Sequence, residues 1–242
     1  MLIAFILAAS IVLQVFAQQG YLPNRRKSFL PATGGGGGGG GGGKSFAQVG
    51  IVHHLYTGTS VTFTPTAGNA LVCFASGGGS AVIVISDNAG NTWSQLKTVS
   101  DPTHTSLRMV GAVALSVAGI STTVTATAVG TSDVGITVLE YSGVTGVLDS
   151  SANGSSTSIV NTLTASETCM FVLGWADETA NSFTSTTLTP GSVSGSLAQR
   201  DTGHFDGQWA FLNAGAGFAA NSYTITTAAS AVSGSCIAIC LK

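Results

Sequence analysis

Charged side chains are scarce in this 242-residue chain, since Asp, Glu, Lys and Arg together make up 7% of it. An ordinary soluble domain has about 25%. Beyond Lys44 the chain carries four basic and ten acidic residues, a net charge of 4 − 10 = −6. A nucleic-acid-binding surface needs clustered Lys and Arg. The sequence therefore predicts no nucleic-acid partner.

The chain also lacks an apolar run of the ~20 residues that a membrane-spanning helix needs. Its first apolar stretch, Leu2–Leu13, is shorter and is followed by a small-residue cleavage site at Val15–Ala17. We interpret residues 1–17 as a signal peptide and expect a secreted, extracellular or surface-associated protein, not an integral membrane protein after cleavage. Basic residues follow the apolar stretch at Arg25–Lys27 and none precedes it. That arrangement opposes translocation, so cleavage of the signal stays open.

Recognisable catalytic motifs are missing: the chain has no G-x-S-x-G elbow, no H-E-x-x-H and no phosphate loop. The remaining acid/base candidates are Glu140, which lies in an otherwise apolar segment, with Asp177, Glu178 or Asp206. Glycoside hydrolysis needs two carboxylates about 5 to 10 Å apart. The spacing gives no evidence that these carboxylates meet. In the alternative interpretation, Glu140 is a structural group satisfied by backbone donors or by Arg.

Side chains that could bind metal or ligand are few. Asp201, His204 and Asp206 form the densest cluster of metal-ligand types and could hold a divalent ion. The alternative is a polar loop between two strands. Trp175 and Trp209 could stack on sugar rings or belong to the core. No cofactor is expected.

Four cysteines leave several disulfide states open. Cys236 and Cys240 lie four residues apart in one expected strand, hence about 13 Å apart, which is too far for a bridge. Cys73, Cys169 and one of the C-terminal pair could meet across adjacent buried strands. All four could equally remain free thiols, because free Cys serves as a small hydrophobic residue.

Glycine is abundant and concentrated, with ten in a row at residues 34–43. Gly-rich chain behaves as a flexible coil. We therefore interpret residues 18–44 as a flexible, Gly-rich, basic linker, and residues 45–242 as a single β-sandwich domain.

From Phe46 onward the hydrophobic pattern has a period of two, which is typical of β-strands. Some segments alternate between apolar and Ser/Thr positions: Ser60–Thr64, Ser121–Ala128 and Asn221–Thr226. Others are apolar on both faces: Ala70–Phe74, Ala81–Ile85, Met109–Val117, Gly135–Tyr141 and Cys169–Leu173. Both kinds are expected when antiparallel sheets pack face to face and some strands are covered again outside. The predicted fold is all-β, a sandwich or jelly-roll-like domain of two packed antiparallel sheets.

Two local patterns refine this prediction. Thr64–Phe74 and Thr162–Val172 each place a small polar turn before a buried strand, a weak internal echo that suggests two comparable halves. Asp87–Asn91 has oxygen-bearing side chains but lacks the alternating carboxylates and terminal Glu of a calcium loop. We expect a tight turn there, with Gly90 at positive φ and Trp93 anchoring the next strand.

Four segments carry a resemblance to a known family: Gly68–Val72, Ser86–Trp93, Leu139–Val144 and Thr164–Gly174. Together they resemble a poorly characterised β-sandwich module of secreted bacterial and some phage-associated proteins, which often lies beside fibronectin-like or adhesive domains. The resemblance covers nearly all of Phe46–Lys242. It implies a β-sandwich, export and surface or matrix binding, and it assigns no catalytic residues.

These observations favour a secreted, non-catalytic β-sandwich that binds or adheres at a cell surface or extracellular matrix. Extracellular polysaccharide and surface proteins are the candidate partners. Two alternatives stay open: a polysaccharide-cleaving enzyme on a jelly roll, and a self-assembling structural subunit of a filament or virion.

Overall fold

The computed structural model describes residues 46–54, 59–78, 82–102, 107–129, 134–155, 158–176, 183–190, 197–204, 208–214, 218–229 and 234–242. In these ranges the chain forms sixteen strands and no helix. They contain no helix with the length and apolarity that crossing a bilayer requires. All of them belong to one compact unit, Gly34–Lys242.

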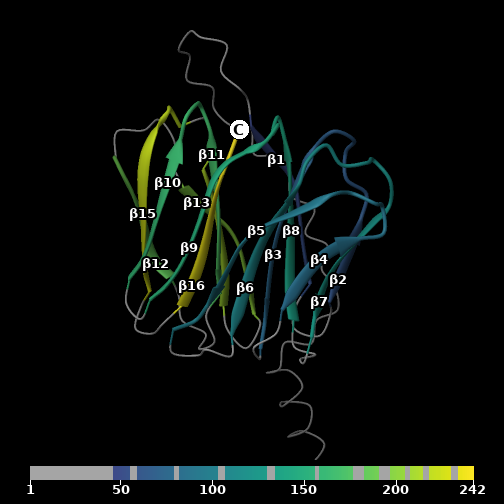
Figure 1. Cartoon of the computed structure of the whole chain (residues 1–242), viewed down its shortest axis with the longest axis horizontal. Helices are drawn as coiled ribbons and strands as arrows, with labels where there is room; N and C mark the ends of the chain where they lie inside the picture. The colour runs from purple at the N-terminus through teal and green to yellow at the C-terminus, as the bar shows by residue number, and fades with distance from the viewer. Residues whose placement is uncertain are drawn as a thin grey trace, which may run out of the picture. The chain divides into compact units, whose positions relative to one another are not determined.

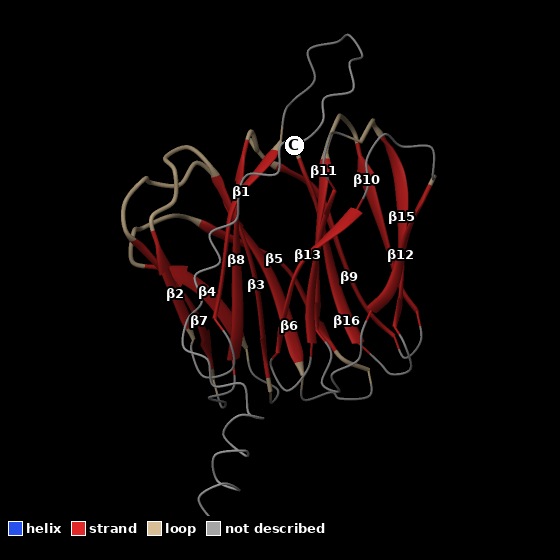
Figure 2. Ribbon diagram, turned by 180° about the vertical axis from the view of Figure 1, so that it is seen from behind, coloured by secondary structure: helices blue, strands red, loops and turns tan. Residues whose placement is uncertain are grey.

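The strands form four antiparallel sheets, seen from opposite sides in Figures 1 and 2. The first outer sheet has the order β2 (Ser60–Phe63), β7 (Thr122–Ala128), β4 (Ile83–Asp87). The first inner sheet has the order β1 (Ala47–His54), β8 (Val134–Ser142), β3 (Ala70–Gly77), β6 (Arg108–Ala114), β5 (Trp93–Ser100). The second inner sheet has the order β13 (Leu197–His204), β14 (Gln208–Ala214), β11 (Met170–Ala176), β16 (Gly234–Leu241), β9 (Val147–Ser155). The second outer sheet has the order β10 (Ser158–Ala165), β15 (Asn221–Ala229), β12 (Phe183–Thr189).

Three apolar layers hold the four sheets in the order outer, inner, inner, outer. Alternate residues of β3 show how: Leu71 and Cys73 pack toward the first outer sheet, whereas Val72 and Phe74 pack toward the second inner sheet. A third layer fills the space between the second inner and second outer sheets. The inner sheets are therefore covered on both faces, and β3, β6, β8, β11 and β16 are buried almost throughout.

The two halves of the unit have the same strand order. If the eight strands of each half are numbered 1 to 8 in chain order, the inner sheet of both halves has the order 1-8-3-6-5 and the outer sheet has the order 2-7-4. The 1-8-3-6 and 2-7-4 neighbours are those of a jelly roll. The register repeats as well: Val72 pairs with Val113 and Leu139, and Val172 pairs with Asn213 and Ile239. The separation is 100 residues each time (172 − 72, 213 − 113, 239 − 139). We call β1–β8 the first repeat and β9–β16 the second repeat.

Irregularities recur at matching places in the two repeats. The pairing of β1 with β8 shifts between Gln48 and Gly50, and the pairing of β9 with β16 shifts where Cys240 gives way to Leu241. The pairing of β5 with β6 shifts between Gln95 and Lys97, as β13 with β14 does between Gln199 and Asp201. Because bulges are specific local features of a fold, their recurrence indicates that the two repeats are one architecture used twice.

The predicted all-β, jelly-roll-like fold is confirmed, with two such sandwiches in place of the single one expected for residues 45–242. The echo between Thr64–Phe74 and Thr162–Val172 falls on equivalent elements, shifted by two residues from the register of the structure. One strand assignment was wrong. Ala81–Ile85 is not covered on both faces, since Val82 and Val84 are 59% and 49% exposed. The reason is that β4 lies in an outer sheet.

Glycines allow the inner sheets to approach closely. A Cβ at Gly174 would lie 2.6 Å from Met109 Cε and 2.7 Å from two ring carbons of Phe74. A Cβ at Gly111 would lie 2.9 Å from Ile237 Cγ2. Such distances are well below van der Waals contact, so the Phe74 ring occupies space that only glycine at position 174 leaves open.

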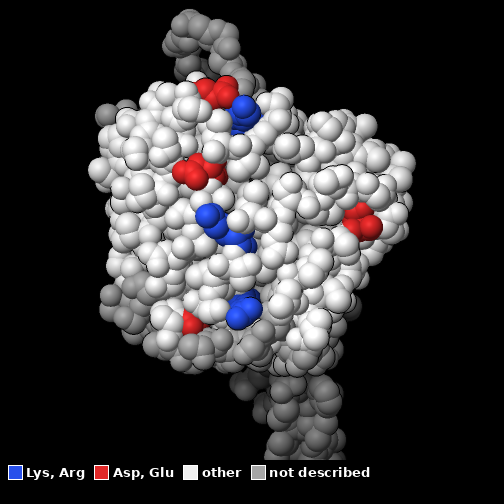
Figure 3. All heavy atoms as spheres, in the orientation of Figure 1, with Lys and Arg blue, Asp and Glu red and all other residues white. Residues whose placement is uncertain are grey.

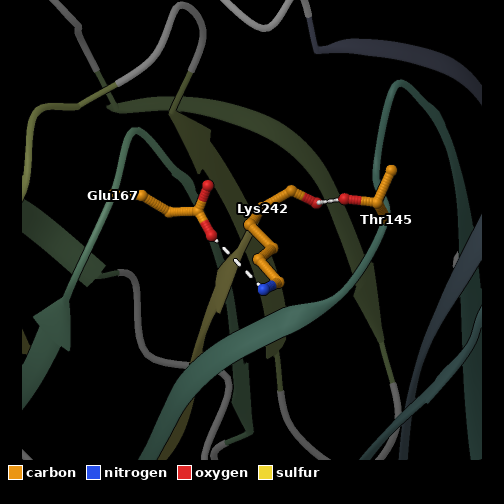
Figure 4. A network of polar contacts seen from close by, with 3 residues as sticks. All are labelled: Thr145, Glu167 and Lys242. Carbon is orange, nitrogen blue, oxygen red and sulfur yellow. Dashed lines mark hydrogen bonds and ion pairs between the residues drawn. The ribbon is translucent and has the colours of Figure 1, made fainter.

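The segment between the repeats is tied to Lys242. The Lys242 N–H donates to Gly146 O at 2.9 Å, and the Thr145 hydroxyl donates to Lys242 O at 3.2 Å. Lys242 Nζ lies 3.3 Å from Glu167 Oε1 (Figure 4). Both charged side chains are more than one-third exposed. An exposed ion pair contributes about 0–1 kcal/mol, so the backbone bonds are the firmer part of this connection.

Candidate functional site

Hydroxyl side chains form aligned rows on the solvent face of the first outer sheet. Because β2, β7 and β4 alternate, most of their apolar residues point inward and most of their Ser and Thr residues point outward; Val84 is exposed and Thr122 is buried. Ser60 pairs with Thr125, which pairs with Ser86 on its other side. In the next row the hydroxyls of Thr62 and Thr123 are hydrogen-bonded at 2.9 Å.

The second outer sheet presents the same kind of face. Thr162 of β10 pairs with Thr224 of β15, which pairs with Thr189 of β12. The adjacent row carries Thr226 and Thr187, and a third row carries Thr164 and Ser222. We call these two surfaces the threonine faces. The outward-facing Ser and Thr residues of these faces whose side chains are described are Ser60, Thr62, Ser86, Thr123, Thr125, Thr127, Ser158, Thr162, Thr164, Thr187, Thr189, Ser222, Thr224 and Thr226.

No Lys, Arg, Asp or Glu belongs to either set of outward positions. Figure 3 shows charged atoms only as isolated clusters on a largely uncharged surface. Neighbouring hydroxyls are spaced by about 6.7 Å along a strand and about 4.8 Å between strands. Each hydroxyl can donate and accept, and each Thr methyl group adds apolar contact. The β-branched side chain also has few rotamers to lose on binding.

Glu140 is a buried structural group. It lies in β8, is 7% exposed, and its Oε1 accepts a hydrogen bond from the Thr66 N–H at 2.8 Å. The same oxygen accepts from Asn69 Nδ2 at 2.6 Å. These two donors belong to the turn between β2 and β3, where Gly68 has a φ of 83°. The Thr66 contact matches the alternative interpretation from the sequence, a carboxylate satisfied by backbone donors or by Arg, whereas the second donor is the Asn69 side chain.

We expect Glu140→Ala to lower the free energy of unfolding by about 2 kcal/mol, because it leaves the buried Asn69 amide and the part-buried Thr66 N–H without an acceptor. Glu140→Gln keeps an oxygen at the same place and should cost about 1 kcal/mol. Urea denaturation of both variants measures the difference. Equal costs for Ala and Gln would contradict the bracing role.

Asp87 organises the turn after β4. Its Oδ1 accepts from the N–H groups of Ala89 and Asn91, and its Oδ2 accepts from Asn91 Nδ2 and Trp93 Nε1, all within 3.1 Å. Gly90 has a φ of 76°, so the predicted turn with a left-handed glycine and an anchored Trp93 is confirmed. Burial raises the pKa of the Asp87 carboxyl, but hydrogen bonds from Asn91, Trp93 and Ala89 outweigh it and leave that pKa below its ordinary value.

The lowered pKa gives the turn a pH dependence. A carboxyl whose folded pKa lies below its unfolded pKa contributes stability that is present above the unfolded value, about 3.9. That stability is lost as the pH falls through the folded value. We expect Asp87→Ala to cost about 1–2 kcal/mol at pH 6 and distinctly less near pH 3. Urea denaturation at the two pH values tests this, and an equal cost at both would contradict it.

Among the sequence-predicted ligand and metal residues, only Trp175 has a described side chain. Trp175 is completely buried between the second inner and second outer sheets, so it does not present a ring to a sugar. Trp209 lies in β14, and Asp201 and His204 lie in β13, not in a loop; their side chains are not among those described. Asp177, Glu178 and Asp206 lie outside the described residues. Within the described residues no three His, Cys, Asp or Glu side chains are grouped for a metal ion.

All four cysteines are described, and all are buried free thiols. Cys73 lies in the apolar layer of the first repeat, and Cys169, Cys236 and Cys240 lie in that of the second. Burial raises the pKa of the Cys73 and Cys236 thiols above the ordinary range. A hydrogen bond with Cys169, followed by burial, raises the pKa of the Cys240 thiol.

The sequence predicted the outward direction of these hydroxyl side chains but not their alignment into the threonine faces. Alternation predicted that the hydroxyls of Ser60–Thr64 and Ser121–Ala128 point outward. It did not show that they meet in rows, because Thr62 and Thr123 are 61 positions apart.

No protein-family model, curated protein or solved structure matches the chain.

Proposed function

We propose that this chain is a secreted, non-catalytic binding and adhesion module that acts at a cell surface or extracellular matrix. Its ligand is an uncharged, hydroxyl-rich polymer such as a neutral polysaccharide, and the threonine faces are its binding surfaces. The observation that supports the proposal is the alignment of exposed Ser and Thr hydroxyls in rows across both outer sheets, without a charged side chain among them.

Such a face suits a repetitive ligand better than a small molecule. A single neutral hydrogen bond contributes about 0.5–1.5 kcal/mol net, so one hydroxyl gives little affinity. A row of hydroxyls on a rigid sheet engages several repeats of one polymer at a low cost in side-chain entropy. Two faces on one molecule add avidity. Affinity for the polymer is therefore expected to exceed that for its monosaccharide by orders of magnitude.

The test replaces threonines of the threonine faces by valine, which removes the hydroxyl group and keeps the shape of the side chain. Thr123→Val with Thr125→Val changes the first face, and Thr224→Val with Thr226→Val changes the second. Each pair should weaken binding to insoluble neutral polysaccharide roughly tenfold, at about 1 kcal/mol for each hydroxyl. Thr98→Val on β5 is the matched control, because Thr98 is exposed but lies in an inner sheet.

Pull-down on cellulose, chitin and xylan, with and without salt, measures the effect. Binding should not depend on salt, because no charged pair is involved. Absence of binding to every neutral polymer, or equal binding by the face variants and Thr98→Val, would contradict the proposal.

A second candidate function is self-assembly into a filament or shell. The observation in its favour is β4, an edge strand of the first outer sheet: its Val84 and the preceding residue Val82 are both exposed. An edge strand with apolar side chains is a template for pairing with another chain. Sedimentation over a wide concentration range tests this candidate: a monomer throughout would dismiss it, and Val84→Lys should abolish any assembly.

A further inference from the structure

One pair of equivalent positions holds different chemistry in the two repeats. In the first repeat Asn69 Nδ2 donates to Glu140 Oε1 at 2.6 Å, joining the turn before β3 to strand β8. The 100-residue relation between the repeats places Cys169 and Cys240 at the equivalent positions (169 − 69, 240 − 140). The pairing supports this equivalence, since Glu140 lies opposite Leu71 and Cys240 lies opposite Phe171. The architecture therefore brings these two side chains together in both repeats.

The second repeat fixes both cysteines firmly. Cys169 exchanges two backbone hydrogen bonds with Phe218, at 2.9 and 2.7 Å. Cys240 is held in β16 between β11 and β9. Both side chains are completely buried in the same apolar layer, and Cys169 lies two residues before Phe171, the residue opposite Cys240. A disulfide needs about 2.05 Å between the sulfur atoms, so its formation requires the two side chains to approach each other within this layer.

The other two thiols have different surroundings. Cys73 lies in the apolar layer of the first repeat, which contains no other cysteine. Burial raises the pKa of the Cys236 thiol, an effect that a hydrogen bond from Asn161 partly offsets, and Cys236 is four residues from Cys240 along β16. That spacing corresponds to about 13 Å, so Cys236 cannot bridge to Cys240.

We propose that Cys169 and Cys240 are the disulfide-forming pair of this chain, and that Cys73 and Cys236 stay reduced. The oxidant is a small or protein-borne disulfide. One cysteine thiolate attacks it and releases one thiol, and the second cysteine thiolate then attacks the mixed disulfide and releases the other thiol. Two protons leave the cysteines and two reach the released thiols, so one disulfide is exchanged for another.

Burial decides when the exchange can happen. The hydrogen bond with Cys169 comes first and burial second in raising the pKa of Cys240, and the thiolate is the form that reacts. The bond therefore forms before the second repeat closes, and once formed it is shielded from reductants in solution. An oxidising compartment, as expected of a secreted protein, supplies the conditions. The inference itself does not depend on a polysaccharide ligand.

The test refolds the full chain from urea with a mixture of reduced and oxidised glutathione, then alkylates it in denaturant. The expected product has two alkylated cysteines, Cys73 and Cys236, and a non-reducing digest yields one linked peptide pair containing Cys169 and Cys240. The oxidised chain should melt roughly 5–15 °C above the reduced chain. Native oxidised protein should also resist a reductant that acts readily in urea.

Cys240→Ser and Cys236→Ser form a matched pair of variants on one strand. Cys240→Ser should lose the linked peptide and the melting shift, whereas Cys236→Ser should keep both. If Cys240→Ser fails to refold, the peptide map of the unaltered chain decides alone. Four alkylated cysteines after oxidative refolding, or a bridge that includes Cys73 or Cys236, would overturn the proposal.

Discussion

Replacing Gly174 by valine is expected to lower the free energy of unfolding by roughly 3–5 kcal/mol, as a more severe case of the 1–3 kcal/mol typical of overpacked cores. Even the first added carbon would lie 2.6 Å from Met109 Cε and 2.7 Å from the Phe74 ring. Both neighbours are themselves fully buried in the layer between the inner sheets. The clash therefore cannot be relieved by moving a side chain into solvent, and the inner sheets must separate. Urea denaturation or thermal melting measures the loss.

A matched control and a rescue test the cause. A Cβ at Gly146 would lie 2.8 Å from Lys242 Cε, the mobile end of a partly exposed side chain. Gly146→Ala should therefore cost less than about 1 kcal/mol. Gly174→Ala should lower the free energy of unfolding less in the Phe74→Leu background than in the unaltered chain. A double-mutant cycle measures this difference as a coupling energy. Strictly additive costs would show that the ring is not the obstacle.

Phe171→Ala is expected to cost about 3–5 kcal/mol. The Phe171 ring is fully buried, and its centroid lies 4.9 Å from that of Phe218 and 5.0 Å from that of Tyr223. Its removal opens a cavity between the second inner and second outer sheets and breaks two aromatic contacts. The melting temperature should fall by roughly 10 °C, and the near-ultraviolet circular dichroism of the buried aromatic rings should weaken.

Val160→Ala in the same repeat is the control for that prediction. Val160 is 40% exposed on the second threonine face, so shortening it should change stability by less than about 0.5 kcal/mol. A cost for Phe171→Ala no larger than that of Val160→Ala would mean that the aromatic cluster does not hold this repeat together.

Much of the architecture could be predicted because hydrophobic alternation reports locally on burial. Val61 and Val124 were expected inside and Thr62 outside, and the structure agrees. Continuous apolar strands such as Ala70–Phe74 correctly indicated cover on both faces. The same rule failed for Val82 and Val84, because an apolar residue on an outer sheet has the same sequence signature as one under a second layer. The number of sheets depends on which strands pair, and periodicity carries no information about that.

The candidate sites depended on contacts between distant segments and were harder to predict. For Glu140 the sequence left a structural role and an acid/base role open, because its donor Asn69 is 71 positions away. The contact between Cys169 and Cys240 was one of several pairings that the sequence left open. The internal echo suggested two halves without their register, since few identical residues remain to align them. Only the backbone pairing shows that Asn69 with Glu140 and Cys169 with Cys240 occupy equivalent places.

The contact between Phe74 and Gly174 also makes the packing surfaces of the two repeats different at equivalent positions. These residues hold equivalent positions (174 − 74 = 100). The Phe74 ring fills space that the missing side chain of Gly174 leaves open. Two copies of the first repeat would bring two rings into the same space, and two copies of the second would leave a void. Association of two first repeats, or of two second repeats, is therefore disfavoured relative to the pairing of one first repeat with one second repeat.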